Sequence, residues 1–245
     1  MLTLTIVPPL FDRFPALRVA GFAVAGLDRA MASVTEADVR RALAEAAAGL
    51  ARSGITSGNA AAAPAIQQWR QVFAACGMAP ATYQSSVESH VRGVLQDDCT
   101  PSTVPAITLS RAISARHLAP LSGYDVDALP GSTVTIRAAR PESDWFVPLG
   151  ARPTDIRSNP DVVVYAADHT VLSWGFNHRD SRQTSLRDDT RRAVFFSEAI
   201  APGQAVAADR ALQDFRHALR QRGAAVGPIV VADARTPSVA VRLRR

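Results

Sequence analysis

The character of the sequence changes near Leu121, and this change limits the folds open to the chain. Before it, most apolar residues recur at the 3.6-residue spacing of amphipathic helices. After it, short runs rich in Val, Ile, Tyr, Phe and Trp are separated by turn signals such as Pro130-Gly131. Helices followed by a series of strands are typical of α+β proteins. The sequence therefore predicts one compact domain over residues 1–245, with a mixed, largely antiparallel sheet layer and helices packed on it.

Several predicted helices begin at recognisable signals. Ser33 and Glu36, and again Ser85 and Glu88, have the spacing of a capping box, and Pro64 suits a first helical turn. Helices are predicted over residues 33–52, 64–77, 85–96, 105–118 and 203–221. Strands are predicted over residues 2–7, 17–27, 124–126, 133–139, 145–147, 162–166, 171–176, 193–200, 229–232 and 239–243.

Residues 161–200 are the stretch most typical of a ligand pocket. Apolar strands flank residues 177–192, which hold five arginines and three aspartates, and Glu198 interrupts the last of these strands. A carboxylate on an apolar strand beside a polar loop is a common pocket lining. Trp174 and Phe176 are two residues apart, which places both on one side of a strand, where core packing is favoured over stacking on a base.

Composition narrows the classes of function. All 27 basic residues are arginine, which excludes a P-loop lysine and a Schiff-base lysine. The net charge of +5 lies beyond Ile200, where 8 arginines face 3 acids, against 19 of each before it. This basic C-terminal region, residues 202–245, suits a polyanion such as RNA. A positive charge excess of this small size also occurs in proteins that bind no nucleic acid.

The common catalytic and targeting signals are missing from the sequence. It contains no GxG, HExxH or GxSxG, and its five histidines lack metal-ligand spacing. Cys76 and Cys99 are far apart, which favours core packing over zinc binding, a disulfide or a nucleophile. There is no membrane span and no basic start of a signal peptide. We therefore expect a cytoplasmic protein without a metal or other cofactor; its oligomeric state stays open.

A series of motifs carries a resemblance to a known family. In chain order they are Trp69-Arg70, S-V-E at 86–88, G-Y-D-x-D at 123–127, D-x5-W-x-x-N at 168–177, T-x5-T at 184–190 and Glu198-Ala199. In this order and spacing they resemble the stand-alone B3/4-domain proteins. That family is similar to the editing and tRNA-binding module of the bacterial phenylalanyl-tRNA synthetase beta subunit. The resemblance is strongest over residues 21–201.

The resemblance implies a function. In the synthetase, the module hydrolyses tyrosine wrongly attached to the phenylalanine tRNA. Tyrosine differs from phenylalanine by one hydroxyl, and a site that hydrogen-bonds this hydroxyl can discriminate between the two amino acids by about 10⁴-fold or more. By this likeness, the chain would bind tRNA or aminoacyl-tRNA and hydrolyse a mischarged ester in trans, with an oriented water and no covalent intermediate. Glu198 matches the acid that reads the substrate side chain; the alternative for Glu198 is an ion pair with Arg191 or Arg192.

The remaining site residues follow from the same likeness and from charge. We expect Asn177, Thr190 and Ser114 to serve catalysis, and Arg179, Thr184, Tyr124 and Arg111 to bind substrate with Glu198. The expected RNA-binding residues are Arg182, Arg187, Arg216, Arg220 and Arg222. Ordinary loop hydrogen bonding is the alternative for Asn177 and Arg179, and turn capping is the alternative for Thr184 and Thr190. Asp125 and Asp127 are expected to be turn and cap acids.

Three positions depart from the family pattern. Thr108 and Arg111 stand where the family usually has Asp and Asn, and the segment starting at Ser122 lacks the synthetase's histidine. These departures favour an alternative function, a noncatalytic RNA- or tRNA-binding module that retains the fold without the editing chemistry.

Overall fold

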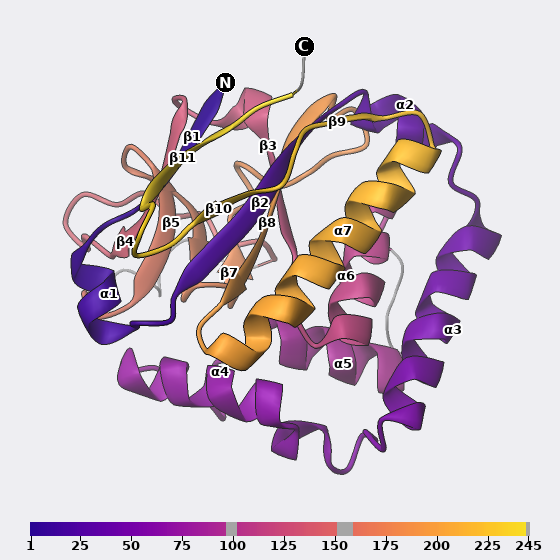
Figure 1. Ribbon diagram of the computed structural model, residues 1–245, viewed down its shortest axis with the longest axis horizontal. Helices are drawn as coiled ribbons and strands as arrows, with labels where there is room; N and C mark the ends of the chain where they lie inside the picture. The colour runs from indigo at the N-terminus through magenta and orange to yellow at the C-terminus, as the bar shows by residue number, and fades with distance from the viewer. Residues whose placement is uncertain (97–101, 151–158, 244–245) are drawn as a thin grey trace.

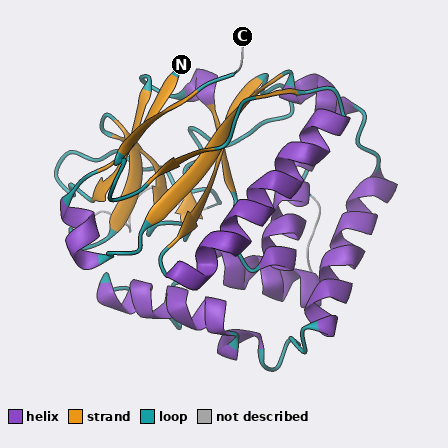
Figure 2. Cartoon of the chain, viewed as in Figure 1, coloured by secondary structure: helices purple, strands orange, loops and turns teal. Residues whose placement is uncertain are grey.

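Two β-sheets share an apolar interior on one side of the molecule, and helices cover the outer face of one of them (Figures 1 and 2). The computed structural model describes residues 1–96, 102–150 and 159–243. Within these, the element order runs from helix-rich to strand-rich and ends in a long helix and short strands. The α+β class with largely antiparallel strands is confirmed.

The first sheet has the strand order β11-β1-β4-β5-β6-β7, and only the β1–β4 pair is parallel. Its strands are β1 (Leu2–Ile6), β4 (Thr133–Ala138), β5 (Val163–Ala167), β6 (Thr170–Trp174), β7 (Arg179–Asp180) and β11 (Ser238–Val241). The second sheet has the order β10-β2-β8-β3 and is antiparallel, with β9 also paired to β2. Its strands are β2 (Arg18–Ala25), β3 (Ser122–Asp125), β8 (Arg192–Ala199), β9 (Ala225–Val226) and β10 (Val230–Ala232).

The helices gather against the second sheet and around one end of the first (Figure 1). They are α1 (Pro9–Arg13), α2 (Leu27–Ala32), α3 (Glu36–Arg52), α4 (Pro64–Ala75), α5 (Ser86–Leu95), α6 (Pro105–His117) and α7 (Ala205–Gln221), with 3-10 turns η1 (Ala60–Ala62), η2 (Val126–Ala128) and η3 (Pro202–Gln204). Helix α7 lies along the second sheet, where Leu212, Phe215 and Leu219 pack on Phe22 and Phe195.

Strand β8 is the central element because its two faces serve different cores. Val194 and Phe196 face the first sheet, where Phe196 meets Tyr165 at a ring distance of 6.2 Å. Phe195 faces the helices and meets Phe215 at 4.7 Å. Side chains alternate along a strand, so Glu198 shares the inter-sheet face with Val194 and Phe196. The fold therefore buries this acid between the two sheets.

Several sequence predictions need correction. The capping box of α3 is Thr35 with Asp38, because the Ser33 hydroxyl instead donates to the carbonyl of Ala30 at the end of α2. Residues 145–147 form no strand, and of these residues only Trp145 makes an isolated bridge, to Thr170 of β6. Phe176 does not share a strand face with Trp174. Its φ of 56° places it in the turn after β6, although both side chains are buried as core packing requires.

Candidate functional site

A polar cleft of about 350 Å³ opens where the start of α5, α6, β3 and the β6–β7 turn meet. Most of its walls carry hydroxyl, imidazole, amide or charged groups. The lining residues that bear on its chemistry are Ser86, His90, Arg111, Asn177, Arg179 and Asp180. Three predicted site residues, Arg111, Asn177 and Arg179, thus come together here.

Asn177 connects the cleft to Glu198. Its side-chain amide donates to Glu198 Oε1 over 2.7 Å, and its side-chain oxygen accepts from the backbone N–H of Ser86 over 3.1 Å. Gly175 and Phe176 both have positive φ, and this sharp turn brings Asn177 back toward β8. Asn177 therefore fixes the first turn of α5 to the buried acid.

Glu198 lies behind the cleft and is only 1% exposed. Burial raises the pKa of its carboxyl to about 7; the Asn177 hydrogen bond opposes this rise and the nearby Asp180 adds to it. Neither arginine suggested as its partner reaches it, since Arg191 lies 3.8 Å from Asp28 and Arg192 pairs with Asp127. The ion-pair alternative is wrong because Arg192 stands six residues away, about 20 Å along the strand.

Asp180 is the carboxylate that lines the cleft itself. The buried Tyr124 hydroxyl donates to its Oδ1 over 3.1 Å. Burial raises the pKa of Asp180, and it also raises the pKa values of Tyr124 and Tyr165 well above their ordinary range. Tyr124 therefore supports Asp180 from behind and, unlike the expectation from sequence, does not line the cleft.

A second polar pair stands on the helical wall. The imidazole Nδ1 of His90 and the hydroxyl of Ser114 are 2.9 Å apart. Burial and the charge of Arg111 lower the pKa of His90 to about 3, so its ring is neutral at physiological pH. Ser114 is fully buried and lies behind His90, away from the lining where catalysis was expected of it.

The opposite rim is formed by the β6–β7 turn and residues near Leu149. Arg179 donates from Nη1 to the carbonyl of Leu149 over 3.0 Å. His178 Nδ1 lies 2.8 Å from the carbonyl of Gln84, which can only accept, so this nitrogen carries the proton. The pKa of His178 is lowered, chiefly because the ring is buried. The hydrogen bond to the Gln84 carbonyl acts to raise this pKa, and the charge of Arg179 acts to lower it.

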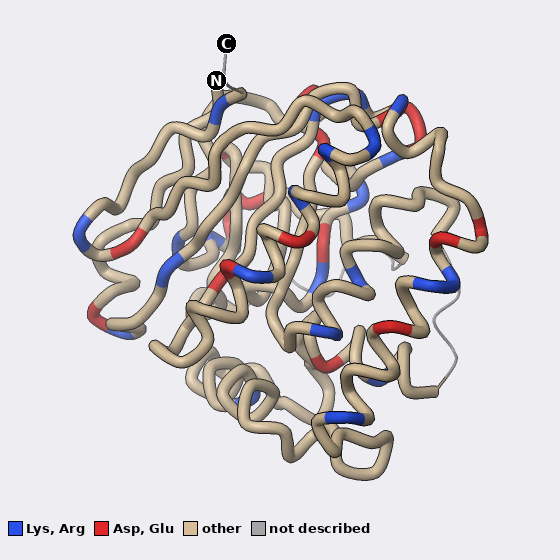
Figure 3. The backbone as a smooth tube through the Cα atoms, turned by 45° about the vertical axis from the view of Figure 1, so that its right-hand side comes forward, with Lys and Arg blue, Asp and Glu red and all other residues tan. Residues whose placement is uncertain are grey.

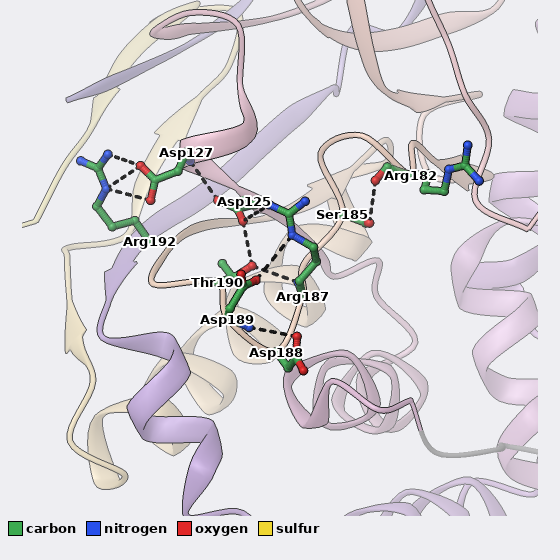
Figure 4. Close-up of polar contacts among 9 residues, drawn as sticks. All are labelled: Asp125, Asp127, Arg182, Ser185, Arg187, Asp188, Asp189, Thr190 and Arg192. Atoms are coloured by element: carbon green, nitrogen blue, oxygen red, sulfur yellow. Dashed lines mark hydrogen bonds and ion pairs between the residues drawn. The ribbon is translucent and has the colours of Figure 1, made fainter.

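The two threonines of the T-x5-T loop lie outside the cleft. Thr190 donates its hydroxyl to Asp125 Oδ2 over 2.8 Å and accepts from the backbone N–H of Arg187 (Figure 4). Thr184 is fully buried, and its backbone carbonyl accepts from the N–H of Asp125. Both residues hold the loop against β3. The turn-capping alternative fits Thr190, whereas the buried hydroxyl of Thr184 has no hydrogen-bond partner in the described chain.

The G-Y-D-x-D acids also have structural partners. Asp125 accepts from the backbone N–H of Asp127 at the start of η2, and Asp127 pairs with Arg192 (Figure 4). Arg187 lies 3.7 Å from Asp125 across this loop. The prediction of a turn or cap acid is confirmed for Asp125, which caps η2, whereas the carboxylate of Asp127 forms an ion pair with Arg192 instead.

The W-R and S-V-E motifs meet in a buried ion-pair cluster. Glu88 is fully buried and accepts from Arg70 over 2.9 and 2.5 Å and from Arg92 over 3.1 and 3.0 Å. Burial acts to raise the pKa of Glu88, but the hydrogen bonds from the two arginines lower it overall. This cluster locks α4 to α5 and so fixes one wall of the cleft.

The arginines expected to bind RNA occupy two regions. Arg182 and Arg187 are exposed on the loop beside the cleft. On α7, Arg216 donates to the carbonyl of Gly227 over 2.6 Å, and Arg222 donates to that of Ala218 over 3.2 Å, so both have structural roles. Arg220 is exposed. Figure 3 shows arginines on both the strand and helix parts of the backbone, with acidic residues between them.

Sequence reasoning missed Asp180, His90 and His178. Asp180 directly follows Arg179, a predicted substrate-binding residue, and this position in the sequence could have pointed to it. The two histidines carry no motif, and only the packing of α5 against α6 and the β6–β7 turn brings them to one cleft. Thr108, one of the departures, is buried, and its hydroxyl accepts from the backbone N–H of Ser102 in the segment that leads into α6.

The last features of the described residues concern metal ligands, cysteines and long apolar helices. Over 1–96, 102–150 and 159–243, no group of three or more His, Cys, Asp or Glu is placed to hold a metal ion. Cys76 is buried and burial raises the pKa of its thiol, whereas Cys99 falls outside the described residues. No helix in the described chain is long and apolar enough to cross a membrane.

Comparisons with known proteins add the family. Among solved structures, the chain is similar to an N-terminal fragment of the phenylalanyl-tRNA synthetase beta subunit from Pyrococcus horikoshii, with a TM-score of 0.47 and 13% identity. The match covers 92% of this chain and 50% of that one, so the chain spans about half the length of that fragment. No curated protein matches. The sequence profile of the B3/4 domain matches residues 68–223, more than half of the chain. The chain therefore belongs to the B3/4 domain family.

Proposed function

We propose that the chain binds the aminoacylated 3′ end of a tRNA in the polar cleft and hydrolyses its ester in trans. The observation that carries this proposal is the placement of Asp180 in one cleft with Arg111 and Arg179. An aminoacyl-tRNA end presents a positive ammonium group and negative phosphates within a short distance. A cleft with charges of both signs complements such a ligand.

The chemistry requires a group that can take a proton from water near neutral pH. Burial raises the pKa of Asp180 above the ordinary value of an aspartate, and a raised carboxyl pKa is a common property of general bases in active sites. Water held at Asp180 would attack the ester carbonyl and pass its proton to the carboxylate. The proton would then move to the departing ribose oxygen, which releases the free amino acid and the tRNA.

Glu198 affects this reaction indirectly, through Asn177. Glu198 holds the amide of Asn177, and Asn177 holds the start of α5 at the cleft wall. We infer that Glu198 maintains the position of Asn177 and acts on the substrate only through it. Among the arginines, Arg182 and Arg187 flank the cleft on an exposed loop and suit contacts to the tRNA backbone.

A deacylation assay with a panel of mischarged and correctly charged tRNAs tests the proposal. We expect at least one aminoacyl-tRNA to be cleared, and Asp180→Asn to slow its clearance by about 100-fold or more, the usual contribution of a general base. Asp188→Asn, on the exposed loop, is the matched control and should retain activity. If wild-type protein clears no aminoacyl-tRNA faster than buffer, the hydrolytic proposal fails.

One observation favours the second candidate, a tRNA-binding module without turnover. Two of the three expected catalytic residues, Thr190 and Ser114, are absent from the cleft lining because Asp125 and His90 engage their hydroxyls. This candidate is supported if tRNA binds with a strong salt dependence while every aminoacyl ester remains intact.

A further inference from the structure

Arg111 is a cation in the cleft that forms no ion pair with any described residue, although its charge acts on the neighbouring Asp180 and opposes the rise that burial causes in the pKa of that carboxyl. It projects from α6 into the lining, and no hydrogen bond or ion pair joins its guanidinium to another residue of the described chain. Other half-buried or buried arginines of this protein behave differently: Arg70 and Arg92 share Glu88, and Arg137 pairs with Asp144 at 2.6 Å. A partly buried guanidinium without a partner marks a place for an anion.

The remaining charges of the cleft leave it cationic. Among the described lining residues, two arginines face a single carboxylate, Asp180. Both histidines of the lining, His90 and His178, have pKa values lowered by burial and by a neighbouring arginine, so neither adds charge at neutral pH.

Two neutral donors line the cleft together with Arg111. His90 uses Nδ1 for its contact with Ser114, which leaves Nε2 for another partner. Ser86 is four residues before His90, on the same face of α5, and its buried hydroxyl has no hydrogen-bond partner in the described chain. Both residues line the cleft with Arg111.

We propose that Arg111, with His90 and Ser86, binds an oxyanion of the ligand, either the carboxylate of an acidic aminoacyl side chain or a phosphate of the RNA end. An apolar aromatic side chain placed against Arg111 would desolvate the guanidinium without replacing its hydrogen bonds, which is unfavourable. The cleft therefore disfavours an aromatic occupant at this wall. The inference rests on the proposed function for the ester chemistry, but oxyanion binding is measurable without turnover.

Calorimetric titration of the full chain tests the proposal, with AMP, inorganic phosphate and the α-amides of L-glutamate, L-glutamine and L-tyrosine as probes, so that no amino-acid probe carries a free α-carboxylate. At least one of glutamate, AMP and phosphate should bind more tightly than glutamine and tyrosine. Arg111→Asn should weaken that binding by about tenfold or more, the effect of losing a charged hydrogen bond, and leave binding of the glutamine and tyrosine probes, which carry no oxyanion, unchanged. Arg210→Asn, an exposed arginine on α7, is the matched control and should bind like wild type.

The probes separate the two sources of the oxyanion. Glutamate binding with no AMP or phosphate binding assigns an acidic side chain, and the reverse assigns a phosphate. His90→Gln is the second variant, to be used if Arg111→Asn is not folded by circular dichroism, and should weaken the same probe severalfold. The proposal is overturned if tyrosine binds more tightly than all three anions, if no anion binds, or if a folded Arg111→Asn protein binds them as wild type does.

Failure of this proposal is distinguishable from failure of the proposed function. If Arg111→Asn changes neither anion binding nor the choice among aminoacyl-tRNAs while deacylation persists, only the oxyanion site is refuted. If anions bind through Arg111 but no tRNA is deacylated, the oxyanion site stands and the hydrolytic function does not.

Discussion

Replacing Glu198 by Gln should stabilise the protein in alkaline solution and leave it almost unchanged in mild acid. The carboxyl has an ordinary pKa of 4.5 in the unfolded chain, and burial raises this pKa to about 7 in the folded protein. Between these values the unfolded chain releases the proton while the folded protein retains it. Folding stability therefore falls as pH rises through this window, and the loss is complete above it.

The size of the effect follows from the two pKa values. Their difference corresponds to about 3 kcal/mol of stability lost by wild-type protein at about pH 8. Glutamine has no charge to bury, and its side-chain oxygen can still accept from the Asn177 amide, so Glu198→Gln escapes this loss. The variant should be about 2–3 kcal/mol more stable than wild type at about pH 8, and nearly equal to it at about pH 5.

Urea denaturation of both proteins at the two pH values measures the difference directly, with tryptophan fluorescence as the signal. Glu142→Gln replaces an exposed glutamate and serves as the control, with the same small difference from wild type at each pH. If the Glu198→Gln protein is equally or less stable than wild type at both pH values, this result would contradict the raised pKa of the buried Glu198 carboxyl.

Three further predictions concern the surroundings of the site. Glu88→Gln should destabilise the fold by about 2–4 kcal/mol in thermal or urea unfolding, because it leaves Arg70 and Arg92 without their shared carboxylate; an unchanged midpoint would contradict the role of this cluster. Gly21→Ala should lower the free energy of unfolding by about 1–3 kcal/mol in the same measurement, because the added Cβ would overlap the Phe196 ring and approach the Phe195 carbonyl to 2.8 Å. A variant as stable as wild type would mean that the Phe196 ring moves freely. Replacing Arg182 by Gln should lower the salt dependence of tRNA binding by about one unit in the log–log slope, and an unaltered slope would remove this residue from the interface.

Much of the fold was predictable because the two periodicities of the chain are clear. The apolar run at 162–166 lies within a residue of β5, and Pro64 does begin α4. Short elements were missed: α1 has only five residues, and Leu27 begins α2 although the sequence placed it at the end of a strand. Such short helices form through tertiary packing, which local propensity does not describe.

The candidate site was predictable only in part. Strand alternation and the family resemblance pointed to Glu198 and Asn177, and the two side chains do meet. Sequence could not show that Asn177 stands in front of Glu198, since this depends on the positive φ of Gly175 and Phe176. Nor could it show that Thr190 turns to Asp125, which lies 65 residues away along the chain.

The most direct test is the structure of the protein with a nonhydrolysable aminoacyl-adenosine, in which an amide replaces the ester. The ligand should occupy the cleft between α5, α6 and the β6–β7 turn, with its ammonium group at Asp180 and its reactive carbonyl within reach of a water held there. A ligand bound elsewhere, for example in the apolar groove near Val24 and Val194, would contradict the assignment of this cleft as the substrate site.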